Sequence, residues 1–190
     1  MVGGAWRRRL GGPEARRGRS NLECPTVEPF TAESTISRPR EEVFEYLADI
    51  ANHAEFTDHY LVDWHLTRED SYGTGAGARF RIKAPLARFN WADVTFAEVQ
   101  PPFRILERGR GGKYNRIRMV GTYELSPGPG GTTRVQYTIE TVPVYPSDHL
   151  MERLGGSAWM RRKTRKALRR LRTILEEGRD RGRRATVAGG

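Results

Sequence analysis

The longest regular pattern of apolar side chains lies near the end of the chain, over Ser147–Gly178. Apolar residues recur there at helical spacing, with small side chains filling the same rows: Leu150, Leu154, Ser157, Met160, Thr164, Ala167, Leu171 and Ile174. Such spacing places them on one side of an α-helix. The other faces carry eight Lys or Arg side chains between Arg161 and Arg172. The pattern predicts a long amphipathic helix with a basic outer face.

Upstream of this helix, apolar and polar side chains alternate over short segments, which is typical of strands. We expect about seven strands, over residues 30–36, 60–67, 78–83, 90–100, 103–108, 117–125 and 135–141. Two short helices are expected after the first strand, one starting near Pro39 and one over Ala51–Phe56. A sheet with one apolar face needs a cover. The sequence therefore predicts an α+β fold in which a bent antiparallel sheet wraps around the long C-terminal helix.

The alternation also predicts which side chains face the core. In the second strand the even positions, Tyr60, Val62, Trp64 and Leu66, are expected to point inward. In the segment 90–100 the apolar residues change parity after Phe96, which indicates a β-bulge. The pattern leaves the orientation of three side chains open: Trp91, Glu98 and Glu107.

Four segments carry a resemblance to a known superfamily: Thr35–Asp49, Glu98–Pro102, Tyr123–Val135 with its glycine-rich turn, and Ala167–Arg172. Their order and spacing resemble the SRPBCC superfamily, which contains START lipid-transfer domains, bacterial polyketide cyclase/dehydratase-like proteins and plant pathogenesis-related allergens. The resemblance covers residues 30–177. It implies the helix-grip fold, in which a bent antiparallel sheet grips the C-terminal helix and encloses a cavity.

In that fold, the large inward side chains would line the cavity: Tyr60, Trp64, Phe80, Met119, Tyr123 and Tyr137 from the strands, and Met160 and Leu171 from the helix. Aromatic rings with polar tips suit an apolar ligand that carries a few hydrogen-bonding groups. The first hypothesis is a carrier or binding protein for a lipid, an isoprenoid quinone or a polyketide. The alternative for each ring is ordinary core packing.

A second hypothesis is an enzyme of the polyketide cyclase/dehydratase type, with Tyr123 or Tyr137 handling a proton, as the resemblance implies. The sequence shows no clear acid–base pair, because Asp63 and His65 are expected to face outward. It contains no nucleophile elbow, phosphate loop or dinucleotide motif, so we expect no cofactor.

Three histidines crowd one region: His53, His59 and His65. Their spacing of six residues does not match a helical pair of metal ligands, so we expect solvated or capping histidines and no metal site. His149 is expected at the surface.

Charge is distributed unevenly over the 190 residues, which carry a net charge of +10. Residues 1–29 and 179–190 are expected to be disordered basic tails around one ligand-binding domain, residues 30–178. The domain without its basic helix is slightly acidic, which argues against nucleic acid as a partner. A third hypothesis is docking to an anionic membrane surface or an acidic protein through the basic helix face, Arg161, Arg162, Arg165 and Arg169.

The compartment is inferred from what the sequence lacks. Cys24 is the single cysteine, which excludes an intramolecular disulfide. The N-terminal Arg run is not followed by the apolar segment of a secretory signal, and no stretch is apolar for the length of a membrane span. We therefore expect a cytoplasmic protein. The sequence does not indicate its oligomeric state.

Overall fold

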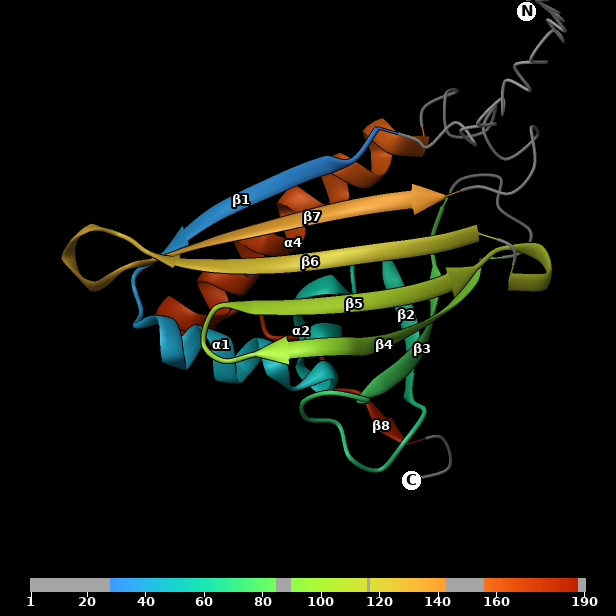
Figure 1. Cartoon of the computed structure of the whole chain (residues 1–190), viewed down its shortest axis with the longest axis horizontal. Coiled ribbons are helices and arrows are strands. Elements are labelled where there is room, and N and C mark those ends of the chain that lie inside the picture. Colours follow the sequence, from blue (N-terminus) through green and yellow to red (C-terminus); the bar gives the residue numbers. More distant parts are fainter. Residues whose placement is uncertain (1–27, 85–89, 116, 143–155, 188–190) are drawn as a thin grey trace, which may run out of the picture.

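An eight-stranded sheet curves around one long helix in the computed structural model of the chain, which describes residues 28–84, 90–115, 117–142 and 156–187 (Figure 1). Its strands and α-helices follow the predicted order as far as α4, whereas β8 and the short 3-10 helices (η) are additional: β1 (Phe30–Ile36), α1 (Arg40–Ala48), η1 (Ile50–Asn52), α2 (His53–Thr57), β2 (Leu61–Leu66), β3 (Gly77–Ile82), β4 (Trp91–Gln100), β5 (Arg104–Gly111), η2 (Lys113–Asn115), β6 (Ile117–Pro127), η3 (Pro129–Gly131), β7 (Thr133–Val142), α4 (Ser157–Glu177) and β8 (Thr186–Val187). The predicted α+β class is confirmed.

Strands β2 to β7 form a meander in which each strand pairs antiparallel with the next. The first strand, β1, joins the other end of the meander by pairing with β7, with Phe30 opposite Ile139. The sheet order is therefore β1-β7-β6-β5-β4-β3-β2-β8. Right-handed strand twist bends such a sheet, so that one face becomes concave.

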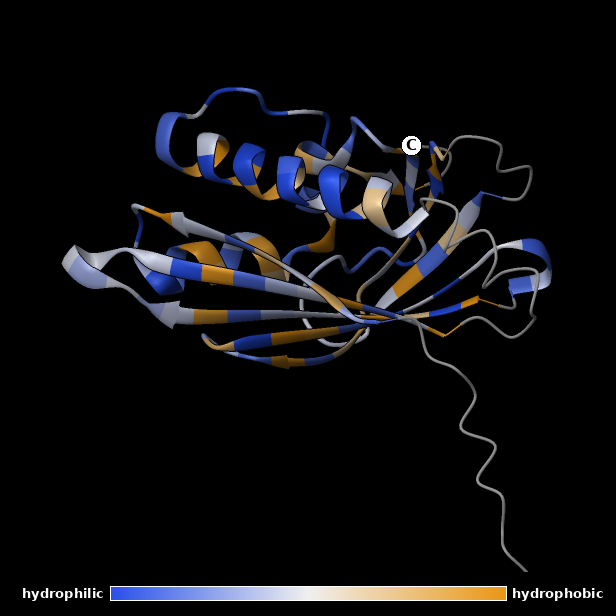
Figure 2. Ribbon diagram, turned by 90° about the horizontal axis from the view of Figure 1, so that it is seen from above, coloured by the Kyte–Doolittle hydropathy of each residue, from blue (hydrophilic) through white to orange (hydrophobic). Residues whose placement is uncertain are grey.

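Helix α4 covers the concave face, as its apolar stripe predicts (Figure 2). Its inward side chains are buried: Thr164, Ala167, Leu168, Leu171 and Ile174. The helix ends at Glu177 and is capped by Gly178, whose φ of 68° is the left-handed conformation that glycine adopts most easily. Among the described residues, no helix is long and apolar enough to cross a membrane. The predicted helix positions Leu150 and Leu154 lie outside the described residues.

Two bulges interrupt the alternation of the strands. The bulge predicted in β4 is confirmed and lies between Phe96 and Glu98. A second bulge, between Val62 and His65, was not predicted. Asp63 adopts a φ of 55° there, and Leu61 rather than Val62 is buried. The expected even-numbered inward face of β2 is therefore wrong at Val62, because the bulge shifts the pleat.

The C-terminal extension, residues 179–187, is placed differently from the disordered tail expected after Gly178. Its backbone donates two hydrogen bonds to the helical segment before β2, from Gly182 N to Glu55 O and from Ala185 N to Ala51 O. The side chain of Ala185 is buried, and β8 adds a parallel strand to the edge of β2. The extension therefore belongs to the folded domain. The expected N-terminal tail lies almost wholly outside the described residues.

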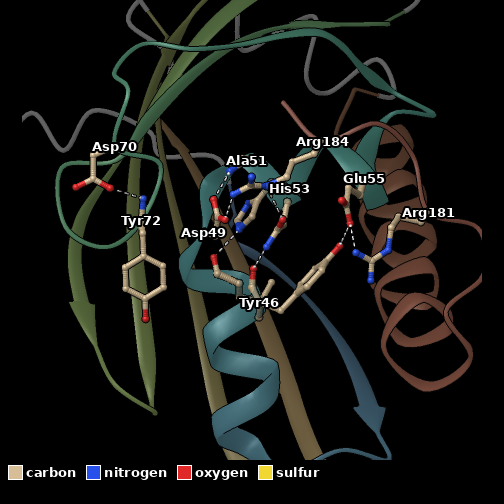
Figure 3. Close-up of polar contacts among 11 residues, drawn as sticks. Tyr46, Asp49, Ala51, His53, Glu55, Asp70, Tyr72, Arg181 and Arg184 are labelled. Atoms are coloured by element: carbon tan, nitrogen blue, oxygen red, sulfur yellow. Dashed lines mark hydrogen bonds and ion pairs between the residues drawn. The ribbon is translucent and has the colours of Figure 1, made fainter. Parts of the chain in front are cut away.

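Ionic contacts of two arginines hold the extension against the helical segment before β2 (Figure 3). The Arg181 guanidinium lies 3.4 Å from Glu55 Oε2, which also accepts a 2.6 Å hydrogen bond from the Tyr46 hydroxyl. Arg184 bonds the Asp49 carboxylate and the Asn52 side chain. These acidic partners lie far upstream in the sequence, so an Arg-rich segment that looks solvated in isolation is paired in the fold.

Candidate ligand cavity

A small cavity of about 60 Å³, the inner chamber, lies between α4, α2 and the concave face of the sheet. By this measure a water needs roughly 10–15 Å³, so the chamber has room for about four waters or a small head group. Its walls combine apolar and hydrogen-bonding side chains: His53, Phe56, Thr57, Tyr60, Leu61, Trp64, Phe80, Val94, Glu107, Tyr123, Tyr137, Thr164, Ala167 and Leu168.

Glu107 is the acidic side chain of this chamber. In β5 it shares the inward face with Ile105, Gly109 and Gly111, all of which are buried. Its own exposed fraction is 8%. The hydroxyl of Tyr137 donates a hydrogen bond to Glu107 Oε1. The sequence left the orientation of Glu107 open, and the structure turns it into the core.

Gly121 makes this arrangement possible. It is the β6 residue that pairs with Glu107, and the carboxyl group of Glu107 lies directly over it. A Cβ at this position would lie 2.6 Å from Glu107 Cγ and 2.7 Å from the Tyr137 hydroxyl. Both distances are shorter than van der Waals contact. The glycine therefore provides the space that the Glu107–Tyr137 pair occupies.

Burial raises the pKa values of the acidic side chains that line the inner chamber. It raises the pKa of Glu107 to about 7, with the Tyr137 hydrogen bond acting in the opposite direction. Burial likewise raises the pKa of the Tyr60, Tyr123 and Tyr137 hydroxyls. The tyrosines therefore keep their protons at neutral pH, whereas Glu107 exchanges its proton there.

The rings of Tyr123 and Tyr137 are stacked, with centroids 4.0 Å apart. One buried polar atom of a wall residue, Trp64 Nε1, has no hydrogen-bond partner, whereas the Thr164 hydroxyl interacts with the Tyr60 hydroxyl. Such orphaned groups are rare in folded proteins and carry a desolvation cost of roughly 1–3 kcal/mol each. Together with Glu107, these side chains make one end of the cavity unusually polar.

A second and larger cavity, the outer chamber, has a volume of about 230 Å³. It lies between the first turn of α4 and the adjoining ends of the strands, and most of its described lining is apolar: Phe30, Ile82, Ala84, Trp91, Ile117, Met119, Ile139, Trp159 and Met160, with Glu28, Asn90, Gly111, Gly112, Thr141, Gly156 and Ser157. The chambers adjoin, because the Tyr60 ring of the inner wall contacts the Trp159 ring of the outer wall at 6.2 Å between centroids.

The side chains expected around a ligand divide between the two chambers. The inner chamber is lined by Tyr60, Trp64, Phe80, Tyr123 and Tyr137. The outer chamber is lined by Met119 and Met160. Leu171 is fully buried and belongs to the core rather than to either wall.

Sequence reasoning missed Glu107, Thr164 and Trp159 as lining residues. In β5, Glu107 lies two residues after the apolar Ile105, and this spacing was the available sequence signal that its carboxyl group faces inward. Trp91, whose orientation the sequence left open, is 41% exposed and lies at the wall of the outer chamber. Glu98, also left open, is half-buried and lies at the bulge of β4, away from both chambers.

His53 corrects the expectation of solvated or capping histidines. It is 4% exposed, and its Nε2 lies 2.9 Å from the Leu47 carbonyl oxygen. A carbonyl only accepts, so Nε2 carries the hydrogen. Burial lowers the pKa of His53 to about 4 and keeps the ring neutral. It packs among aromatic rings as a core residue.

The other two histidines of the region are only partly exposed. His59 Nε2 lies 3.3 Å from the Lys163 carbonyl oxygen, and His65 stacks on Trp91. Within the described ranges, no three His, Cys, Asp or Glu side chains are grouped to hold a metal ion. His149 lies outside those ranges.

The four arginines considered for an anionic partner are all exposed on the outer face of α4: Arg161, Arg162, Arg165 and Arg169. Arg170 differs from them, because its side chain is 17% exposed. It bonds the Asp58 carboxylate and the Asp180 carbonyl oxygen, and so ties α4 to the C-terminal extension.

A protein-family model described as polyketide cyclase/dehydrase and lipid transport matches residues 29–176. No curated protein sequence matches the chain.

Solved structures share the fold. The protein TTHA0849 of Thermus thermophilus is 17% identical, with a TM-score of 0.61 over 78% of this chain and 97% of that protein. The KanY protein is 16% identical, with a TM-score of 0.62 over 78% of this chain and 99% of KanY. DynU16, from the dynemicin biosynthetic locus, is 19% identical, with a TM-score of 0.55 over 82% of this chain and 50% of DynU16. At these identities the likeness establishes the helix-grip fold alone.

Proposed function

The chain belongs to the polyketide cyclase/dehydrase and lipid transport family, and on this basis we propose that it binds a hydrophobic small molecule between the sheet and α4. The ligand class is a lipid, an isoprenoid quinone or a polyketide chain. Its apolar body occupies the outer chamber and its polar head reaches the inner one. The protein then acts as a carrier or binding protein.

The observation that carries this proposal is the outer chamber, about 230 Å³ of space with a mainly apolar wall. A strongly hydrated ligand would gain little from such a wall. Removing apolar surface from water contributes roughly 25 cal/mol per Å², so burying about 200 Å² of a ligand contributes about 5 kcal/mol before the entropy cost of association. Useful affinity therefore needs no strong polar contact.

Filling the outer chamber tests the proposal. The Met160→Trp substitution places a larger ring where the ligand body would lie, and we expect it to weaken binding of the uncharged fluorophore Nile red by about tenfold or more. Fluorescence titration measures the affinity. Arg165→Trp is the matched control, because it adds the same ring to the exposed face of the same helix. Equal affinities of wild type and Met160→Trp would contradict the proposal.

A second candidate function is a cyclase/dehydratase-type enzyme, which the buried Glu107–Tyr137 pair favours. A carboxyl group with a pKa of about 7 is suited to proton transfer at neutral pH. Tyr123 and Tyr137 would then orient the reacting carbonyl, since both hydroxyls stay protonated. The two candidates differ in one observable, because an enzyme converts a poly-β-ketone chain whereas a carrier releases it unchanged.

A further inference from the structure

The inner chamber has the polar groups of a head-group site but no cation among its described lining residues. Glu107 is the acidic group there, and the described wall of the outer chamber adds only Glu28 as a charged residue. A carboxylate or phosphate in the inner chamber would approach Glu107 without a Lys or Arg to neutralise it. Burying such an unpaired charge is strongly unfavourable.

A hydrogen-bond donor, by contrast, is available to a ligand oxygen. Trp64 Nε1 can only donate and has no partner. A ligand oxygen bonded to it would recover the cost of its isolation. An uncharged oxygen accepts this bond without bringing a charge into the chamber.

On these observations we propose that the inner chamber selects ligands with an uncharged oxygen head, a ketone, enol or phenol, held by Trp64 and Glu107. The proposal rests on the proposed function, since it names the head group of the same ligand. Tyr137 positions Glu107 by donating to one carboxyl oxygen, which leaves the carboxyl proton free for the ligand.

The proposal implies that affinity for a ketone depends on pH through Glu107. Four other titratable groups line the chamber: Tyr137 from β7, Tyr123 from β6, Tyr60 from the turn before β2, and His53 from α2. Burial raises the pKa of each tyrosine and lowers the pKa of His53 to about 4, so these groups stay uncharged near neutral pH. Of the titratable groups that line the inner chamber, Glu107 is therefore the one that changes charge near neutral pH. Above about pH 7 it loses the proton that it donates to a ketone.

Calorimetric titration with two ligands of equal chain length tests the selection: methyl decyl ketone and laurate. At about pH 6 laurate is already mostly ionised, and we expect it to bind the wild-type protein at least about fivefold more weakly than the ketone binds at the same pH. We also expect ketone affinity to fall about fivefold or more between about pH 6 and about pH 8.5. In Glu107→Gln the amide donates at both pH values, so ketone affinity should stay constant.

Glu124→Gln is the matched control, because Glu124 is exposed on β6. It should retain the wild-type fall in ketone affinity. Laurate binding as tightly as the ketone, or a wild-type ketone affinity that is independent of pH, would overturn the head-group proposal. If Nile red still binds in the outer chamber, the proposed function stands in that case. Failure of Nile red, ketone and laurate alike to bind would overturn both. The two wild-type comparisons decide the matter even if Glu107→Gln does not fold.

Discussion

The buried position of Glu107, which disfavours its charged form, depends on its neighbours in the sheet. Strand pairing sets it beside Gly121, and the next strand, β7, brings the Tyr137 hydroxyl to its carboxyl group. The missing side chain of Gly121 leaves the space that this carboxyl group fills. The acid is thereby held inside an apolar wall, where its charged form is disfavoured.

This environment predicts how Glu107 affects stability. Its pKa is about 7 in the folded protein and near 4.5 when unfolded, so ionisation favours unfolding. The stabilising contribution of the protonated group is complete below about pH 4.5 and is lost as pH rises through 7. We expect the unfolding free energy of wild type, relative to Glu107→Gln, to fall by up to about 3 kcal/mol from pH 4.5 to above pH 7. Urea unfolding over this range measures the difference.

The comparison with the variant is needed because His53 acts in the opposite direction. Its pKa falls from 6.5 to about 4 on folding, so its contribution is present above pH 6.5 and lost as pH falls. The two groups offset each other in the wild-type profile, whereas His53 cancels in the difference between the two proteins. A difference that does not change with pH would show that Glu107 ionises as it does in water.

At the scale of elements, α4 was predictable because a single periodicity determines it. One face of the helix packs on one sheet, and its buried positions are those of the apolar stripe. Glu107 was not predictable in the same way. The bulge at Phe96/Glu98 breaks the parity of the β4–β5 hairpin, and an acidic side chain gives no hydrophobic signal of its own burial.

The C-terminal extension was mispredicted for a different reason. Composition describes how a segment behaves alone, and an Arg-rich, glycine-containing segment alone remains solvated. Its order comes from Asp49 and Glu55, more than a hundred residues upstream, and from the open edge of β2. Long-range pairing of this kind leaves no pattern within the segment.

Removing the extension should therefore destabilise the domain. Truncation after Gly178 exposes the edge of β2, deletes two backbone hydrogen bonds and leaves Glu55 without Arg181. We expect the unfolding free energy to fall by about 2 kcal/mol, since exposed ion pairs contribute little and the hydrogen bonds and buried carboxylate contribute more. Denaturant unfolding measures it. Deleting residues 188–190 alone is the control, and an unchanged stability after the longer truncation would contradict this role.

At the scale of the whole molecule, charge and apolar surface are separated. The Arg-rich face of α4 points away from the sheet (Figure 2). The apolar outer chamber lies beside the first turn of that helix, and the more polar inner chamber lies between α4, α2 and the sheet. A ligand with an apolar body and an uncharged head matches this order of environments. The proposed ligand would therefore have its two ends in two chambers of different chemistry.

Native mass spectrometry of the purified protein, followed by organic extraction and identification of what co-purifies, tests the central claim most directly. We predict a stoichiometric complex with an apolar molecule whose head group is an uncharged oxygen, and loss of that complex in Met160→Trp. A protein that carries no ligand and also fails to bind a panel of uncharged apolar fluorophores would contradict the claim. The rings of Tyr60, Trp64 and Phe80 would then serve only to pack the core.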